Sequence, residues 1–283
     1  MSRIVYVNGA YLPEAEARIS VFDRGFLFAD GVYEVSSVLA GKLIDNANHM
    51  ARLERSLGEL RMRAPVPLAE IPAIQREIVA RNTLDEGMVY LQVTRGAADR
   101  DFRFPKGAKP SLVVFSQAKN LLEDPVAARG ISVVTLPDIR WRRRDIKTVQ
   151  LLAPALAKQA ALDAGADDAW LVEDGLITEG TSNNAYIVTQ EGTIVTRALS
   201  HSILHGITRR AVLGLAERAG LAVEERGFTA DEAYEAAEAF ITSASSFVYP
   251  VVRIDDRILG NGAPGPVATR LRRLYIEMAL AES

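Results

Sequence analysis

The 283-residue sequence predicts an α+β fold that is divided into two domains. Strand patterns and helical patterns occur in both halves of the chain, and a polar stretch containing Pro125 interrupts them at 116–129. The length suffices for two domains of ordinary size. We therefore expect a small N-terminal domain at 1–118, an interdomain linker at 119–128 and a larger C-terminal domain at 129–283.

The first half opens with the pattern of a β-hairpin. Apolar Ile4 to Val7 precedes Asn8 and Gly9, the residue pair most favoured in two-residue hairpin turns, and a second strand is expected from Tyr11. Apolar residues that recur every three or four positions predict helices further on, and prolines end the first of these. The remaining elements expected here are strands at 32–39, 88–94 and 112–115 and helices at 48–62 and 68–82.

The second half combines β-branched stretches with helices that end at glycines. An alanine-rich helix at 151–164 is followed by Gly165, and an amphipathic helix at 207–219 is followed by Gly220. Further helices are expected at 229–236 and 267–281. Strands are expected at 131–135, 169–172, 185–188, 193–195, 221–225, 239–242 and 251–254.

Composition excludes several classes of function. A formal net charge of −3 and a pI of about 5.8 provide no strong basic field for nucleic acid or an anionic membrane. The absence of cysteine excludes disulfides, thiolate catalysis and cysteine-ligated metal, and three scattered histidines do not indicate zinc, so we expect no metal site. The N-terminus does not resemble a signal peptide, and no apolar run is long enough for a membrane span, so we expect a cytoplasmic protein.

Two residues are candidates for covalent or electrostatic chemistry. Lys147 follows the arginines at 142–144, whose positive charge could lower the pKa of its amine and make it a Schiff-base nucleophile. Glu179 lies in a polar stretch at 178–184, where a carboxylate could hold the nitrogen of a heterocyclic cofactor in its protonated form. On the residues alone, an exposed lysine and a polar loop are favoured over these roles.

Three further patterns could bind phosphate. Gly206, Ile207 and Thr208 open a helix, and free backbone N–H groups at a helix start attract anions. A turn of small hydroxyl residues follows the strand expected at 239–242. Arg52 lies one helical turn from His49 and could clamp a phosphate, although a solvated helix face would look the same.

Taken together and in order, these stretches resemble the fold-type IV pyridoxal-phosphate enzymes, most closely the D-amino-acid transaminases. The resemblance extends over nearly the whole chain. The stretches that carry it lie at 23–25, 30–35, 49–53, 93–96, 138–147, 156–159, 178–180, 206–209 and 242–243.

This resemblance implies a fold, a cofactor and an activity. The fold would be a small N-terminal α/β domain and a larger C-terminal α/β barrel-like domain, in a homodimer. The activity would move the amino group of D-amino acids such as D-alanine to a 2-keto acid such as 2-oxoglutarate, through aldimine chemistry of pyridoxal 5′-phosphate at Lys147. No nucleic acid or membrane partner is implied.

The resemblance also assigns roles to individual residues. Lys147 would be the catalytic lysine, and Tyr33 and Arg100 would contact the substrate. The residues implied to bind the cofactor are Arg52, Lys147, Glu179, Ser182, Asn183, Leu204, Ile207, Thr208, Ser243 and Ala244.

One position departs from the family pattern. D-specific members carry an Arg-x-His pair for the substrate carboxylate, whereas this chain has Arg100 followed by Asp101 and Phe102. One donor is therefore lost, and Asp101 could compete for Arg100. The alternatives on the same fold are a branched-chain L-amino-acid transaminase, a 4-amino-4-deoxychorismate lyase and an (R)-amine transaminase, and a final alternative is a non-catalytic protein that binds pyridoxal phosphate.

Overall fold

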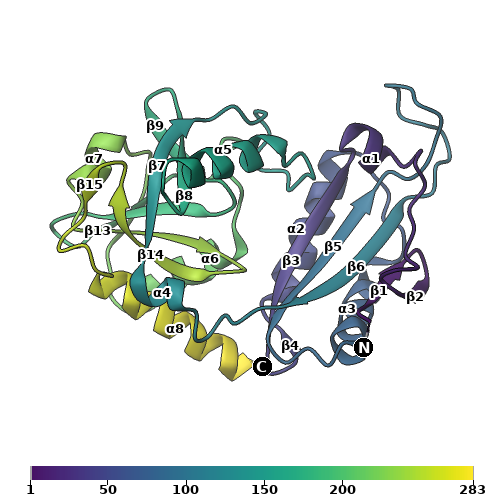
Figure 1. The fold of residues 1–283 in the computed structure, drawn as a ribbon, viewed down its shortest axis with the longest axis horizontal. Helices are drawn as coiled ribbons and strands as arrows, with labels where there is room; N and C mark the ends of the chain where they lie inside the picture. Colours follow the sequence, from purple (N-terminus) through teal and green to yellow (C-terminus); the bar gives the residue numbers. More distant parts are fainter. Residues whose placement is uncertain (1, 283) are drawn as a thin grey trace. The chain divides into compact units, whose positions relative to one another are not determined.

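The computed structural model describes residues 2–282, which divide into two compact units, each built on its own sheet (Figure 1). Unit 1 contains the residues up to Asn120 together with Ile146–Gln150, and unit 2 contains Leu121–Asp145 and Leu151–Ala281. The expected two-domain α+β fold is confirmed. The segment Ile146–Gln150, which carries Lys147, groups with unit 1 and so departs from the boundaries expected at 1–118 and 129–283.

Unit 1 is built on an antiparallel six-stranded sheet with the order β2-β1-β6-β5-β3-β4. Its strands are β1 (Ile4–Val7), β2 (Ala10–Pro13), β3 (Gly31–Leu39), β4 (Lys42–Leu43), β5 (Gly87–Thr94) and β6 (Ser111–Ala118). The expected hairpin turn is confirmed, since Asn8 and Gly9 both adopt positive φ, 48° and 105°, between β1 and β2. An isolated bridge between Val32 and Thr148 attaches the 146–150 segment to the edge of β3.

The helices of unit 1 are α1 (Arg24–Phe28), α2 (Asn46–Glu59), a 3₁₀ turn at Leu68–Glu70 and α3 (Ile71–Arg81). Helix α2 packs on β3 and helix α3 packs on β6 (Figure 1). The apolar stripe expected on α2 is buried through Leu53 and Leu57. The single helix expected at 68–82 is instead a 3₁₀ turn followed by α3, whose start contains Pro72, which lacks the N–H that a helix interior would need.

Unit 2 is built on a nine-stranded mixed sheet with the order β12-β11-β10-β13-β14-β7-β8-β9, and β15 pairs with β14. Its strands are β7 (Ile131–Pro137), β8 (Asp168–Glu173), β9 (Leu176–Gly180), β10 (Asn184–Val188), β11 (Ile194–Thr196), β12 (Val223–Glu225), β13 (Glu238–Ser243), β14 (Phe247–Ile254) and β15 (Arg257–Ile258). A three-residue turn connects β9 to β10, and the Gly180 N–H donates to the Asn183 carbonyl across it. The sheet therefore curls until its end strand β9 lies close to β10.

The helices of unit 2 are α4 (Pro125–Arg129), α5 (Leu152–Asp163), α6 (Ile207–Arg218), α7 (Ala230–Tyr234) and α8 (Pro266–Glu282). Helix α5 packs on β7 and β8, and α6 packs on β12 and β13. The core of this unit is filled by apolar side chains with no exposed surface, among them Trp170, Phe228 and Val195. Helix α4 begins inside the stretch expected to be a linker at 119–128 and ends one residue beyond it.

The strand β9 was not expected from the sequence, since Thr178 and Glu179 suggested a polar loop. Both side chains are buried, and both are hydrogen-bonded inside unit 2. A polar strand is stable in the interior when its donors and acceptors have partners. None of the helices within residues 2–282 combines the length and the apolar character needed to cross a membrane.

Candidate active site

Lys147 is held against β3 by backbone hydrogen bonds on both sides. The Tyr33 N–H donates to the Lys147 carbonyl at 3.0 Å, and the Val149 N–H donates to the Gly31 carbonyl at 3.1 Å. A Cβ on Gly31 would lie 2.9 Å from the Val93 carbonyl oxygen, so glycine is needed at this point of β3. The backbone of this segment is therefore fixed along the start of the strand.

The Lys147 side chain is placed over an aromatic ring. Its Nζ lies 4.1 Å from the centroid of the Tyr33 ring, and no other residue within 2–282 accepts a hydrogen bond or forms an ion pair with this nitrogen. The Tyr33 ring stacks in turn on Tyr90, at 5.4 Å between centroids. A lysine amine without an ion-pair partner is available to condense with an aldehyde.

Arg52 belongs to a buried charged triad with Glu34 and His49. The Arg52 Nε and one terminal nitrogen donate to the two Glu34 oxygens at 2.8 and 2.7 Å, and His49 Nδ1 lies 2.7 Å from Glu34 Oε2. Burial opposes ionisation of Glu34, but the charge and hydrogen bonds of Arg52 and those of His49 lower its pKa to about 2. Burial also lowers the pKa of His49. Glu34 therefore fixes the orientation of Arg52, the residue expected to bind the phosphate.

Arg100 lies beside two phenylalanine rings that contact each other. Its guanidinium carbon is 5.4 Å from the centroid of Phe28 and 5.6 Å from that of Phe102, and it has no ion pair among the described residues. The expectation that Asp101 could compete for Arg100 is wrong, because the Asp101 carboxylate binds Arg103 at 2.6 Å. Arg100 therefore remains available for a carboxylate ligand.

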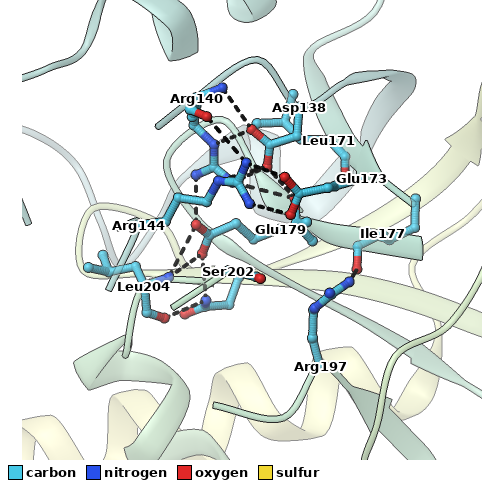
Figure 2. Close-up of polar contacts among 12 residues, drawn as sticks. Asp138, Arg140, Arg144, Leu171, Glu173, Ile177, Glu179, Arg197, Ser202 and Leu204 are labelled. Atoms are coloured by element: carbon cyan, nitrogen blue, oxygen red, sulfur yellow. Dashed lines mark hydrogen bonds and ion pairs between the residues drawn. The ribbon is translucent and has the colours of Figure 1, made fainter. Parts of the chain in front are cut away.

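Glu179 occupies the centre of the polar cluster in unit 2 (Figure 2). Its Oε1 accepts from Arg140 at 2.7 Å, its Oε2 accepts from Asn184 at 2.9 Å, and both oxygens lie within 3.2 Å of the Leu204 N–H. Burial raises the pKa of Glu179, although the charge and hydrogen bond of Arg140 act in the opposite direction. The carboxylate is therefore oriented by three groups, and its ionisation is opposed by its own burial.

A second layer of charge holds Arg140. Asp138 accepts from Arg140 through both of its oxygens, at 2.9 and 2.7 Å, and its Oδ2 also accepts from Thr178. Arg144 makes a bidentate pair with Glu173, at 2.7 and 2.9 Å. Of the three arginines considered as positive neighbours of Lys147, Arg144 is therefore paired with a carboxylate.

Arg143 is also paired, with Asp145 at 3.0 Å. Arg142 is exposed. Ion pairs inside unit 2 therefore occupy two of the three positive charges that the sequence placed before Lys147.

The start of α6 is an open helix N-terminus. Gly206 is the N-cap, and no side chain caps the helix. A Cβ on Gly206 would lie 2.1 Å from the Asn184 Oδ1, so a side chain at this position would displace the Asn184 amide. The N–H groups of Ile207 and Thr208 at this turn are suited to an anion.

The hydroxyl turn after β13 belongs to the same end of the sheet. Asn184 is the cross-strand neighbour of Thr242, so the next residues, Ser243 and Ala244, continue from the strand beside the Glu179 cluster. The Ser243 hydroxyl lies 2.7 Å from that of Ser246. Unit 2 thus brings together Glu179, Leu204, the α6 start and this turn.

Two expected cofactor ligands have a different environment. Asn183 donates to the buried Asp168 at 2.8 Å, as Thr181 does at 2.6 Å, so these side chains hold the β9–β10 turn. Ser182 between them is exposed. Their binding of a cofactor stays a prediction.

Three residues at the site were missed from the sequence. Arg140 and Asn184 contact Glu179 directly, and Asp138 binds Arg140. Arg140 and Asp138 lie in a stretch that contributed to the resemblance, but nothing in their spacing indicates a contact 39 residues away along the chain.

The family of the chain follows from its similarity to known proteins. The family model of amino-transferase class IV matches residues 31–254. The chain belongs to the class IV aminotransferases. A D-alanine aminotransferase of Bacillus licheniformis is 39% identical over 279 residues, which cover 99% of this chain and 98% of the relative. A D-alanine aminotransferase of Staphylococcus haemolyticus is 35% identical over 96% of this chain and 98% of the relative.

Solved structures support the same family. The structure of a T.th. branched-chain amino acid aminotransferase with pyridoxamine 5′-phosphate has a TM-score of 0.91 and 28% identity, and the match covers 100% of this chain and 96% of that one. The resemblance to fold-type IV enzymes is therefore confirmed, and the protein is an aminotransferase that depends on pyridoxal phosphate.

The residues of this aminotransferase fit that cofactor. An uncapped helix start that begins at a glycine suits a phosphate, and a buried carboxylate that Arg140, Asn184 and the Leu204 N–H hold in place suits a protonated ring nitrogen. Lys147, whose amine has no ion pair within the described residues, suits the aldehyde. Each part of the cofactor thus has a matching group in one of the two units.

Proposed function

We propose that this aminotransferase moves the amino group of D-amino acids such as D-alanine to a 2-keto acid such as 2-oxoglutarate. The observation that supports this most strongly is the 39% identity to a D-alanine aminotransferase over 99% of the chain. The branched-chain enzyme shares the fold at a lower identity of 28%. Specificity for branched-chain L-amino acids is therefore the second candidate.

The cofactor, Lys147 and Glu179 would each have a separate role in the reaction. Pyridoxal phosphate, when bound, supplies an electron-withdrawing ring and carries the amino group between the two half-reactions. Lys147 would bind the aldehyde and, once released by the substrate amine, would take the proton from the substrate Cα as general base. Glu179 would accept a hydrogen bond from the ring nitrogen and keep that nitrogen protonated.

Phosphate binding would fall to the N–H groups and hydroxyls already described. Ile207 and Thr208 would donate from the open start of α6, Ser243 and Ala244 from the turn after β13, and Arg52 would contribute its positive charge. Leu204 would pack on the ring, and its backbone N–H donates to Glu179. Ser182 and Asn183 would flank the site.

Substrate recognition would depend on Arg100 and Tyr33. The Arg100 guanidinium is free of ion pairs among the described residues and can bind an α-carboxylate. Phe102, which is 78% exposed, offers no donor where D-specific relatives carry histidine. We expect weaker carboxylate binding and a wider substrate range than an Arg-x-His pair would give.

The test is a comparison of amino donors. The cofactor-loaded enzyme is mixed with D-alanine or L-leucine, with and without 2-oxoglutarate, and the visible absorbance of the cofactor and the keto acid formed are followed. We expect D-alanine to bleach the visible band, with continued pyruvate formation only when the acceptor is present. Reaction with L-leucine alone would favour the branched-chain alternative.

If neither donor reacts, the other activities known for this fold become the candidates. Pyruvate released from aminodeoxychorismate without any acceptor would identify a lyase, and turnover of an (R)-amine would identify an amine transaminase. A protein that binds the cofactor but turns over none of these would be non-catalytic.

We also propose that the enzyme is a homodimer, as the family resemblance implies, and that it is cytoplasmic. Light scattering after size-exclusion chromatography should then give twice the chain mass of 30.8 kDa. Cell fractionation of the host should place the activity in the soluble fraction.

A further inference from the structure

The charged groups around Glu179 do not balance one another. The cluster contains the two arginines Arg140 and Arg144 and the three carboxylates of Asp138, Glu173 and Glu179 (Figure 2). With all five groups ionised, it carries one net negative charge, and the one further positive charge that acts on it, that of Arg142 on Glu173, belongs to an exposed side chain. Four of the five side chains are at most 11% exposed, and only Glu173 reaches 22%.

An unbalanced charge is costly where water is excluded. Two changes remove it: a proton binds to the carboxylate, or a cation arrives beside it. Burial raises the pKa of Glu179, which favours the first change, the binding of a proton. A protonated ring nitrogen beside Glu179 would be the second, and it would balance the charge with all five groups of the cluster still ionised.

We propose that Arg140 is a positioning residue, clamped by Asp138, which keeps Glu179 ionised and aimed so that the shared proton resides on the ring nitrogen of the cofactor. This inference rests on the proposed role of Glu179 and deepens it. Arg140 does not itself touch the cofactor in this account.

The geometry of Arg140 suits the role. Its Nε and one terminal nitrogen bind the two Asp138 oxygens, and its other terminal nitrogen binds Glu179 at 2.7 Å. A guanidinium held at two points cannot turn away from the third, whereas a lysine ammonium is a single point charge on a flexible stem. Arg144 and Glu173 form a paired second layer, with Arg144 also 3.4 Å from Asp138.

The distance of Arg140 from Glu179 and from the ring nitrogen decides which of these two groups binds the shared proton. Arg140 touches the carboxylate directly, so its positive charge lowers the proton affinity of Glu179 more than that of a ring nitrogen on the far side of that carboxylate. Without Arg140, a buried Glu179 takes the proton, the ring nitrogen becomes neutral, and the cofactor withdraws electrons less strongly.

The test uses pyridoxal phosphate labelled with nitrogen-15 in the ring, bound to the wild type and to Arg140→Met. The NMR shift of the labelled nitrogen reports its protonation. We expect a protonated nitrogen in the wild type and a largely neutral one in Arg140→Met, with kcat for D-alanine reduced by roughly ten- to 100-fold and KM little changed. Arg129→Met is the control, because it removes another bidentate arginine pair of unit 2, with Asp167.

Two further variants make the result decisive. Arg140→Lys should restore the shift only in part, and Asp138→Asn, which keeps Arg140 but loosens its clamp, should move the shift in the same direction as Arg140→Met. If Arg140→Met fails to fold, the shifts of these two variants decide. A wild-type nitrogen shift in all the Arg140 and Asp138 variants that fold would overturn the proposal.

Glu179→Gln separates the proposed role of Arg140 from the proposed role of Glu179, on which it rests. If Glu179→Gln changes the nitrogen shift and the Arg140 variants do not, the role of Glu179 stands and the role of Arg140 is wrong. If Glu179→Gln leaves the shift unchanged, the proposed contact of Glu179 with the ring nitrogen is wrong, and the inference about Arg140 falls with it.

Discussion

Replacing Glu34 with glutamine tests whether the triad in unit 1 stabilises the fold. The side chain of Glu34 has no exposed surface, and it accepts two hydrogen bonds from Arg52 and lies 2.7 Å from His49 Nδ1. Glutamine keeps the size of the side chain but removes its charge and one of its two acceptor oxygens. The buried Arg52 would then lose the carboxylate that binds it at two points.

The magnitude can be worked out in two ways. A fall in the pKa of Glu34 from 4.5 to about 2 corresponds to roughly 3 kcal/mol of folding free energy at neutral pH, at about 1.4 kcal/mol per unit. Removing one partner of a buried ion pair costs about 3–5 kcal/mol in other proteins. We therefore expect Glu34→Gln to lower the free energy of unfolding by about 3 kcal/mol at pH 7.

The pH dependence has a defined sign. The pKa of Glu34 is lower in the folded protein than in the unfolded chain, so its contribution is fully present above pH 4.5 and is lost as the pH falls toward 2. The pKa of His49 is also lowered, by burial, so its contribution is present above pH 6.5 and is lost below that value. Wild-type stability should therefore begin to decline below pH 6.5 through His49 and decline further between pH 4.5 and 2 through Glu34, and Glu34→Gln should decline less over the lower window.

Urea unfolding of the cofactor-saturated protein measures this effect. Both tryptophans, Trp141 and Trp170, belong to unit 2, so their fluorescence follows that unit, whereas circular dichroism follows both. The control is Glu77→Gln, which breaks an ion pair with Arg81 whose side chains are both 45% exposed and which should cost at most about 0.5 kcal/mol. Equal costs for the two variants would refute the assigned role of the triad.

Three substitutions test the remaining roles. Lys147→Ala should lower kcat by roughly 1,000-fold or more and abolish the visible band of the bound cofactor, and a retained band would contradict the assignment. Arg100→Ala should raise KM for D-alanine by roughly ten-fold while Arg103→Ala should not, since Arg103 is bound to Asp101; an unchanged KM would remove Arg100 from the substrate site. Gly206→Ala should weaken cofactor binding by roughly ten-fold in a fluorescence titration, because its Cβ would lie 2.1 Å from the Asn184 Oδ1, and unchanged affinity would argue against phosphate at the start of α6.

The parts of the fold that the sequence predicts are those with local causes. Asn8 and Gly9 form their turn because both adopt positive φ readily, and α6 begins at Ile207 and ends just before its expected limit because its apolar spacing and its terminal glycine act within a few residues. Strand β9 was missed for the opposite reason. Its burial depends on partners that come from distant loops, so its own polar residues suggest exposure.

The site shows the same division. Lys147, Glu179 and the start of α6 lie in stretches whose residue types indicate their chemistry, and the family resemblance connects these stretches. The partners that hold them do not follow from spacing, since Arg140 reaches Glu179 across 39 residues and Leu204 reaches it across 25. Only the curled sheet of unit 2 brings these loops to one end of β9 and β10.

The Asn184 side chain connects Glu179, Leu204 and the start of α6 at this end of β9 and β10. Its Nδ2 donates to Glu179 and to the Leu204 carbonyl, at 2.9 and 3.0 Å, while its Oδ1 lies where a side chain on Gly206 would have to go. One amide therefore sets the position of the carboxylate proposed for the ring nitrogen and of the helix start proposed for the phosphate. Because the ring nitrogen and the phosphate are joined through one small molecule, the distance between their two binding groups has to be fixed by the protein, and the Asn184 side chain links those groups directly in unit 2.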